Sequence, residues 1–180
     1  MEITVGGLTI EAVVGDIAAQ GDIDIVVNAA NAELRTGGGV AGALHRAAGP
    51  ELAEAGRPLA PIKPGQAVIT DAFNLPNGHV VHCLGPVYGR DEPAAELLAS
   101  CYENALRRAE EAQARSIAFP ALSSGAFGYP LQEAAEIAVN AVAARASGLR
   151  HVRLVRFVLF NGATAEVFES QLKQLAGDTI

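Results

Sequence analysis

The sequence predicts an α/β fold, a three-layer α/β/α sandwich with a mixed central sheet. Short apolar runs typical of buried strands alternate with longer segments of helical periodicity from residue 24 onward, which is the pattern of parallel strands joined by helices. Two further strand pairs are joined by glycine-containing turns, Gly6-Gly7 and Asn77-Gly78. Because such turns join antiparallel neighbours, the sheet is expected to be mixed.

The elements follow from this alternation of periodicities. Strands are expected at residues 2–5, 8–14, 25–27, 66–72, 79–84, 116–122 and 152–160. Helices are expected at 40–48, at the start of 51–64, at 96–113, at 130–146 and from 162 to about 177. Gly49-Pro50 ends the first helix, and Pro130 suits the first position of a later one.

Composition limits the class of protein. The chain has 180 residues, of which 50% are hydrophobic and only 18% charged. This argues against disorder and is enough for one compact domain, so we expect residues 1–180 to form a single domain without a linker or repeat. The net charge of −7 argues against a nucleic-acid duplex as the main partner.

The cellular setting is expected to be the cytoplasm. No apolar run is long enough to span a bilayer, and Met1 leads directly into a strand-like segment without a signal peptide. Cys83 and Cys101 lack metal-ligand spacing and are expected to be buried free thiols. His79 and His82 lie in one strand with no third ligand nearby, so structural histidines are favoured over a metal site. We expect no membrane partner and a monomer.

The stretch from Asn28 to Gly49 carries the first functional signal. Asn28 and Asn31 follow a buried strand, and three glycines, Gly37 to Gly39, precede a helix. Glycines allow backbone N–H groups to approach a ligand, and the helix adds its positive dipole end, so the arrangement favours an anion such as phosphate. A flexible surface loop is the alternative for a glycine run alone, and neither a Walker loop nor a dinucleotide fingerprint is present.

A second loop of the same kind follows a later strand. Ser123 to Pro130, SSGAFGYP, again lies between a strand and a helix. Two such loops suit a diphosphate better than one phosphate. Because ligands of open α/β sheets bind outside the carboxyl ends of the strands, the two loops are expected to face one ligand.

Three other side chains at strand ends have two possible roles each. Asp16 either caps its own turn or accepts a hydrogen bond from a ligand amino group such as adenine N6. Phe127 and Phe160 lie at strand exits, where core packing is the default role and stacking on a base or sugar is the alternative.

Together these motifs resemble the macrodomain family, and most closely its MacroD-type branch. The similarity covers nearly the whole chain in the expected order. The matching phrases are Gly15-Asp16-Ile17, Asn28-Ala29-Ala30-Asn31, Gly37-Gly38-Gly39-Val40, His45 to Gly49, His79 to Gly89 (HVVHCLGPVYG) and Ser123 to Pro130.

The resemblance implies a cleft for ADP-ribose across the carboxyl ends of the central strands. Asp16 and Ile17 would bind the adenine, with Phe160 stacked on it and Asn161 beside it. Asn31 and Phe127 would hold the distal ribose. The diphosphate would lie between two groups of backbone N–H donors, those of Gly37, Gly38, Gly39 and Val40 and those of Ser123, Ser124, Gly125, Ala126 and Phe127; Asn28 is included among the ligand-binding residues.

The sequence departs from this branch at Ala41. MacroD-type hydrolases usually have an aspartate at this position, which is regarded as positioning or activating the attacking water. Alanine cannot do so, and losing a general base typically costs on the order of 10²–10⁴ in rate. His45 lies one helical turn beyond and would share the face of Ala41, but without its usual partner.

Two functions therefore remain open. The first is hydrolysis of ADP-ribosyl esters, either mono-ADP-ribosylated Asp or Glu on proteins or O-acetyl-ADP-ribose, with a substrate phosphate activating the water. Asn31, Gly38 and Phe127 would be the catalytic residues, with possible support from His45 and no cofactor. The second is a non-catalytic ADP-ribose-binding module.

Overall fold

A computed structural model describes residues 1–178 of the chain, and these form one seven-stranded sheet. Its order is β1-β2-β7-β6-β3-β5-β4. The strands are β1 (Glu2–Val5), β2 (Leu8–Val14), β3 (Ile25–Ala29), β4 (Ala67–Asp71), β5 (His79–Cys83), β6 (Ser116–Phe119) and β7 (Leu154–Leu159).

The mixed sheet expected from the sequence is confirmed. The five inner strands β2, β7, β6, β3 and β5 are parallel, whereas β1 and β4 pair antiparallel at the two edges. The carboxyl ends of the five parallel strands therefore meet along one edge of the sheet. This edge is where ligands of such sheets bind.

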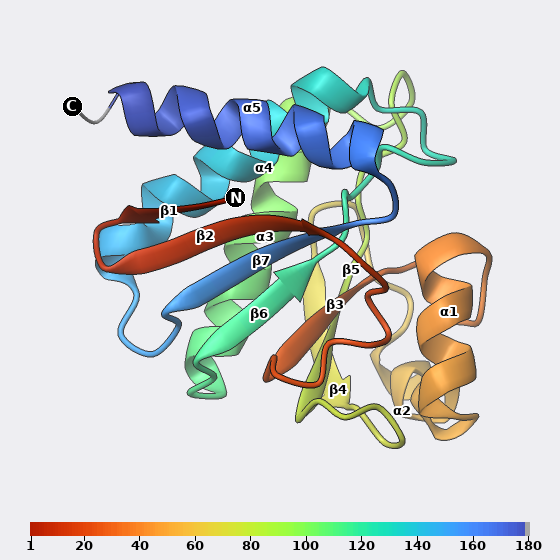
Figure 1. Ribbon diagram of the computed structural model, residues 1–180. Coiled ribbons are helices and arrows are strands. Elements are labelled where there is room, and N and C mark those ends of the chain that lie inside the picture. Colours follow the sequence, from red (N-terminus) through yellow and green to blue (C-terminus); the bar gives the residue numbers. More distant parts are fainter. Residues whose placement is uncertain (179–180) are drawn as a thin grey trace.

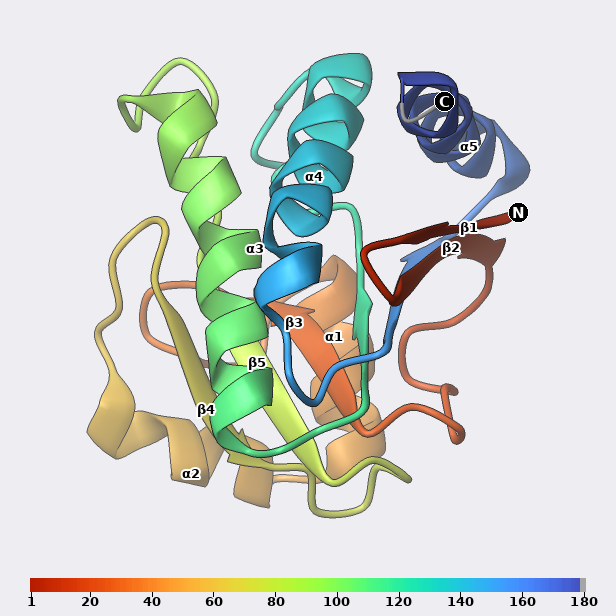
Figure 2. The same ribbon diagram turned by 90° about the vertical axis from the view of Figure 1, so that its left-hand side faces the viewer.

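Helices cover both faces of the sheet, as Figures 1 and 2 show. One face carries α3 (Ala94–Glu111), α4 (Leu131–Arg145) and α5 (Gly162–Asp178), and the other carries α1 (Gly39–Ala48) and α2 (Glu51–Gly56). Short 3₁₀ turns follow α2 at Arg57–Leu59 and α4 at Ala146–Gly148. The three-layer α/β/α architecture is thus the one that the alternation of strand and helix patterns predicts.

The sheet is buried on both faces because successive strand residues point to opposite sides. On β3, Ile25 and Val27 pack in the larger core under α3 to α5, whereas Val26 packs in the smaller core against α1. The larger core centres on four aromatic rings, Tyr102, Phe119, Phe157 and Phe168. This double burial explains why the parallel strands are continuous apolar runs.

One turn differs from its expected form. β4 and β5 do form an antiparallel hairpin, but residues 72–78 connect them, so Asn77-Gly78 is not a two-residue turn. Asn77 is buried, and its Nδ2 donates to the carbonyl oxygens of Gln20 (2.8 Å) and Ile23 (2.7 Å). The asparagine therefore fastens the hairpin loop to the segment before β3.

Two other expectations can be compared with the structure. Cys83 and Cys101 are buried free thiols, as expected, and their sulfurs contact main-chain carbonyl oxygens. None of the helices within residues 1–178 is long and apolar enough to cross a membrane.

Candidate functional site: a row of loops along the carboxyl edge of the sheet

Five loops line the edge where the parallel strands end. In spatial order they follow β2, β7, β6, β3 and β5. Neighbouring strands lie about 4.8 Å apart, so the row from β2 to β5 extends over about 19 Å. The predicted site residues fall into this row: Asp16 and Ile17 after β2, Phe160 and Asn161 after β7, Ser123 to Phe127 after β6, and Asn31 and Gly37 to Val40 after β3.

The glycine turn after β3 brings main-chain N–H groups to the surface. Gly37, Gly38 and Gly39 are all exposed, and Gly39 has φ +54°, a conformation that favours glycine. Gly38 is the N-cap of α1, so the first N–H groups of the helix have no intrahelical partner. A Cβ on Gly42 would lie 2.5 Å from the carbonyl oxygen of Gly37, so only glycine there lets the helix pack this closely on the turn.

The loop after β6 presents a second set of donors. Ser123 has φ +64°, and its carbonyl oxygen accepts a hydrogen bond from the N–H of Tyr129 (2.9 Å), which closes the loop. The N–H of Gly128 donates to Gly125 (3.0 Å). The main-chain N–H groups of Gly125, Ala126 and Phe127, at the tip of this loop, have no hydrogen-bond partner within residues 1–178. Both turns can therefore donate to an anion.

The loop after β2 is held by hydrogen bonds on both sides of Asp16. Asp16 Oδ1 accepts from the N–H of Ala18 (2.9 Å), so the turn-capping role is confirmed. The carbonyl oxygen of Asp16 accepts from Gln20 Nε2 (2.8 Å), and Gln20 Oε1 in turn accepts from Arg156 Nη1 (2.9 Å). Asp16 is exposed while Ile17 is buried, so the carboxylate faces solvent on a fixed loop.

Phe160 is the most exposed large apolar side chain among the described residues, at 81%. Core packing, its default role from the sequence, is therefore wrong for this residue. Asn161 next to it directly precedes α5, and its Oδ1 accepts from the N–H of Thr164 (2.8 Å) as the N-cap of the helix. The cap fixes the backbone at the strand end from which the exposed ring extends.

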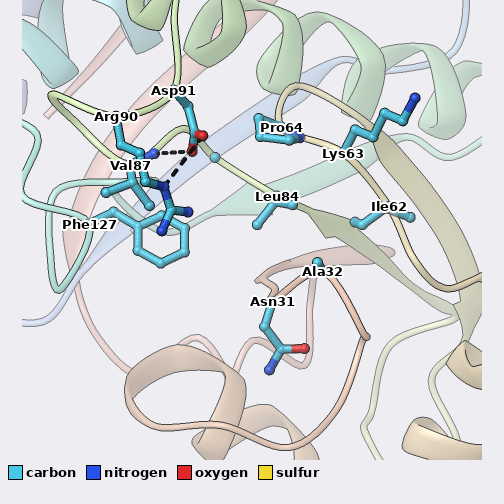
Figure 3. A pocket seen from close by; sticks show the side chains of 11 residues that line it. Asn31, Ala32, Ile62, Lys63, Pro64, Leu84, Val87, Arg90, Asp91 and Phe127 are labelled. Carbon is cyan, nitrogen blue, oxygen red and sulfur yellow. Dashed lines mark hydrogen bonds and ion pairs between the residues drawn. The ribbon is translucent and has the colours of Figure 1, made fainter.

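A cavity of about 350 Å³ lies at the other end of the row, where the loops after β3, β5 and β6 meet (Figure 3). Asn31 and Phe127 both line it. The N–H of Tyr88 donates to the carbonyl oxygen of Phe127 (2.9 Å), which ties two of these loops together. Phe127 is half-buried against a small apolar cluster, so it combines the core and the lining roles.

The amide of Asn31 closes its own loop in this structure. Its Nδ2 donates to the carbonyl oxygen of Arg35 (2.9 Å), and its Oδ1 accepts from the N–H of Arg35 (2.9 Å). Asn31 is half-buried and lines the cavity from this fixed position. Its side chain is thus oriented before any ligand arrives.

A buried polar cluster lies within the fold on the same strands. Asn28 Nδ2 bonds His82 Nδ1 (3.1 Å), and His82 Nε2 bonds Thr70 Oγ1 (3.0 Å). Asn28 is only 1% exposed, so its side chain does not face the ligand as the sequence suggested. It instead links β3 to β5 through its hydrogen bond to His82. The structural role expected for His82 is confirmed.

The cluster includes polar atoms that have no partner. Asn28 Oδ1 and both ring nitrogens of His45 are buried without a hydrogen bond within residues 1–178. Burial, followed by the nearby His45, lowers the pKa of His82 to about 4, and burial also lowers the pKa of His45. Both imidazoles are therefore neutral at pH 7. No group of three or more potential metal ligands occurs in the described part of the chain.

Comparisons with known proteins decide the family. The family described as Macro domain matches residues 27–138. A protein of Klebsiella pneumoniae named O-acetyl-ADP-ribose deacetylase is 46% identical over 167 residues, which cover 90% of this chain and 95% of that protein. The chain belongs to the macrodomain family.

Solved structures agree with this assignment. An Oceanobacillus iheyensis macrodomain with ADP matches this macrodomain with a TM-score of 0.94 and 37% identity, covering 99% of this chain and 97% of that one. A Trypanosoma brucei macrodomain in complex with ADP-ribose gives a TM-score of 0.82 at 31% identity, covering 89% of this chain and 68% of that one.

The macrodomain's cavity includes residues that sequence reasoning did not select. They come from the segment before β4 and from the loop after β5: Ile62, Lys63, Pro64, Leu84, Val87, Arg90 and Asp91. Most are ordinary apolar residues in separate segments, so no motif marks them. The quoted phrase from His79 to Gly89 contains two of them and ends one residue before Arg90.

Proposed function

We propose that this macrodomain binds ADP-ribose along the row of loops and hydrolyses ADP-ribosyl esters, both O-acetyl-ADP-ribose and mono-ADP-ribosylated Asp or Glu on proteins. The observation that carries the proposal is the pair of turns with free N–H groups, Gly37–Val40 and Gly125–Phe127, beside a cavity lined by Asn31. Such donors suit a diphosphate even in a chain of net charge −7. The named deacetylase relative and the neighbours solved with ADP and ADP-ribose support it.

In this proposal the ligand follows the order of the strands. Adenine lies at the β2 and β7 end, where Asp16 accepts from its amino group and the N–H of Ile17 donates to it. The exposed ring of Phe160 stacks on the base, with an apolar contact that the polar loops lack. The diphosphate lies between the β3 and β6 turns, and the distal ribose lies between Asn31 and Phe127.

The reaction consumes one water molecule. The ester bond breaks, the acid half leaves as a carboxylate with release of a proton, and the ribose regains a hydroxyl group. Ala41 is buried and carries no acid group, so it cannot activate the water. We assign that role to a phosphate oxygen of the substrate, while Asn31 orients the ribose and the turn at Gly38 holds the phosphates.

A non-catalytic ADP-ribose-binding module is the second candidate, and Ala41 is the observation that favours it. The same contacts would form, but no turnover would follow because no protein group would act as a base. His45 does not replace the missing acid by itself, since its buried ring nitrogens have no partner and burial lowers its pKa.

One time course separates the two candidates. The protein is incubated with O-acetyl-ADP-ribose and, in parallel, with a protein mono-ADP-ribosylated on a carboxylate, and the products are followed by mass spectrometry. Release of ADP-ribose that depends on Asn31 supports the hydrolase. Tight ADP-ribose binding by calorimetry with no release above the protein-free control would favour the binding module.

A further inference from the structure

The cavity continues past the position proposed for the distal ribose. Asn31 follows β3, and β5 is the next strand in the row. The loop after β5 contributes Leu84, Val87 and Arg90 to the cavity. In Figure 3 Val87 and Arg90 lie on the side of Phe127, whereas Ile62 and Pro64 lie on the opposite side. The strand order thus places the residues of the loop after β5 one step beyond the sugar.

We propose that this part of the cavity, formed by Ile62, Pro64, Leu84, Val87 and Arg90, binds the carboxylic-acid half of the ester. The proposal rests on the proposed function, because it names the group that the distal ribose carries. It assigns to the cavity a preference for acids with a hydrocarbon chain longer than that of acetate.

The lining explains this preference. A ribose is covered with hydroxyl groups and gains little from the side chains of Ile62, Leu84 and Val87, whereas a hydrocarbon chain gains from each contact. The N–H of Val87 donates to Asp91 Oδ2 (2.8 Å), so the apolar wall is fixed in place. Each methylene that such a wall removes from water strengthens binding by roughly fourfold.

The charges at the cavity fit an acid rather than an amine. Asp91 is engaged by the N–H of Val87 and by Arg90, whose Nε lies 3.6 Å from Asp91 Oδ1. The guanidinium of Arg90 is largely exposed, so it can also contact a second carboxyl group. The ammonium of Lys63 points away from the other side chains that Figure 3 labels. Arg90 is therefore the cation best placed for the released carboxylate.

Two kinds of substrate would place the same acid group in this cavity. A free acyl ester of ADP-ribose and an ADP-ribosylated glutamate both present a short hydrocarbon chain that ends in the esterified carboxyl group. The test therefore has two arms, one with O-acetyl- and O-butyryl-ADP-ribose and one with a peptide mono-ADP-ribosylated on glutamate.

The experiment compares the wild type with Val87→Phe, which fills the cavity from a half-buried loop position, and with Val87→Ala, which enlarges it. Ile137→Phe is the matched control, because Ile137 is half-buried beside a different pocket between α3 and α4. For each protein we measure ADP-ribose affinity by calorimetry and kcat/KM for each ester. If an ester is not turned over, its affinity is measured on the intact compound instead.

The wild type should favour the butyryl over the acetyl ester by roughly fifteenfold, since two further methylenes are buried at about fourfold each. Val87→Phe should abolish this ratio or the release from the peptide, and the arm that responds identifies the source. Val87→Ala removes part of the apolar wall and should reduce the ratio, whereas Ile137→Phe should leave ADP-ribose affinity within about twofold.

Two failures have different meanings. Absence of ADP-ribose binding in the wild type would overturn the proposed function itself. Normal ADP-ribose binding, with equal acetyl and butyryl values and no effect of Val87→Phe in either arm, would overturn only the acid-binding cavity.

Discussion

The loop after β2 is held by hydrogen bonds from Arg156 through Gln20 to Asp16, whereas the fold near the glycine turn contains buried polar atoms without partners, on Asn28 and His45. The first arrangement is exposed to water at Asp16, and its side chains are hydrogen-bonded. The second is costly, since a buried unpaired polar atom typically costs about 1–3 kcal/mol.

The contrast shows how the two ends of the row of loops differ in what they can do. The β2 and β7 end offers a carboxylate and an exposed aromatic ring, which can supply affinity for a base without chemistry. The β3, β5 and β6 end combines free N–H groups, a cavity and unpaired buried groups, as reaction sites do. Changes at the first end should therefore alter binding, and changes at the second should alter turnover.

Asn31→Ala should give the largest effect, and this effect should fall mainly on turnover. We expect the rate of ester hydrolysis to drop by on the order of 10²–10³, because the ribose loses the group that orients it. ADP-ribose affinity should change by less than about tenfold. Asn140→Ala, on the exposed face of α4, is the matched control. A wild-type rate in the time course would place the chemistry elsewhere.

The buried histidines should make folding stability depend on pH. The pKa of His82 is about 4 in the folded protein and about 6.5 when unfolded, so protons bind the unfolded chain first as the pH falls. The contribution is therefore fully present above pH 6.5 and is lost on acidification. We expect the free energy of unfolding to fall by about 2–3 kcal/mol between pH 7 and pH 4.5.

This loss is measured by urea denaturation at several pH values. Most of the loss due to His82 falls between pH 6.5 and pH 5, above the range in which carboxylates with lowered pKa values, such as Asp22 and Glu110, add to the loss. His82→Gln should flatten the slope, and His79→Gln, in the same strand but outside the cluster, should retain it. An unchanged slope in His82→Gln would contradict the assignment.

Asp16→Ala should weaken binding and spare the chemical step. Loss of a charge-assisted hydrogen bond to adenine corresponds to about 1.5–3 kcal/mol in ADP-ribose affinity by calorimetry. The rate at saturating substrate should remain within about twofold. Asp71→Ala removes the same charge from an exposed position at the opposite edge of the sheet and serves as the control. Equal affinities for the wild type and Asp16→Ala would refute the adenine contact.

Ala41→Asp should give the smallest effect and the only gain. The new carboxylate would lie on the face of α1 shared with His45 and close to Gly37, whose added Cβ would be 3.8 Å from the Ala41 Cβ. We expect the rate of hydrolysis to rise by about tenfold. This is less than the full effect of a general base, because the surrounding residues do not position the new carboxylate for that role. Ala43→Asp, on another face of α1, should give no gain.

The sequence predicts the loops at the carboxyl edge of the sheet because their function depends on recognisable residue types, above all glycine. Gly39 needs its positive φ, and Gly37 and Gly38 follow a buried strand, so position and composition agree. The burial of β3 on both faces could also be anticipated, since the short apolar run at 25–27 leaves no face for water.

The acid-binding cavity could not be predicted in the same way. Its walls combine Ile62 from the segment before β4 with Leu84 and Val87 from the loop after β5, and only tertiary packing brings these together. Asn28 is the reverse case, in which the sequence predicts a ligand contact that the structure does not support. Its type and place beside Asn31 suggest a ligand contact, but strand alternation turns its side chain into the fold, where it meets His82.

The exposure of Phe160 has a practical consequence. The chain contains no tryptophan, and a ring that is 81% exposed can be enlarged with little cost to packing. Phe160→Trp would therefore place a single tryptophan, which can be excited selectively beside the tyrosines, at the proposed adenine position. Its emission should be quenched when a nucleotide base stacks on it, which would turn the protein into an optical sensor for its own ligand.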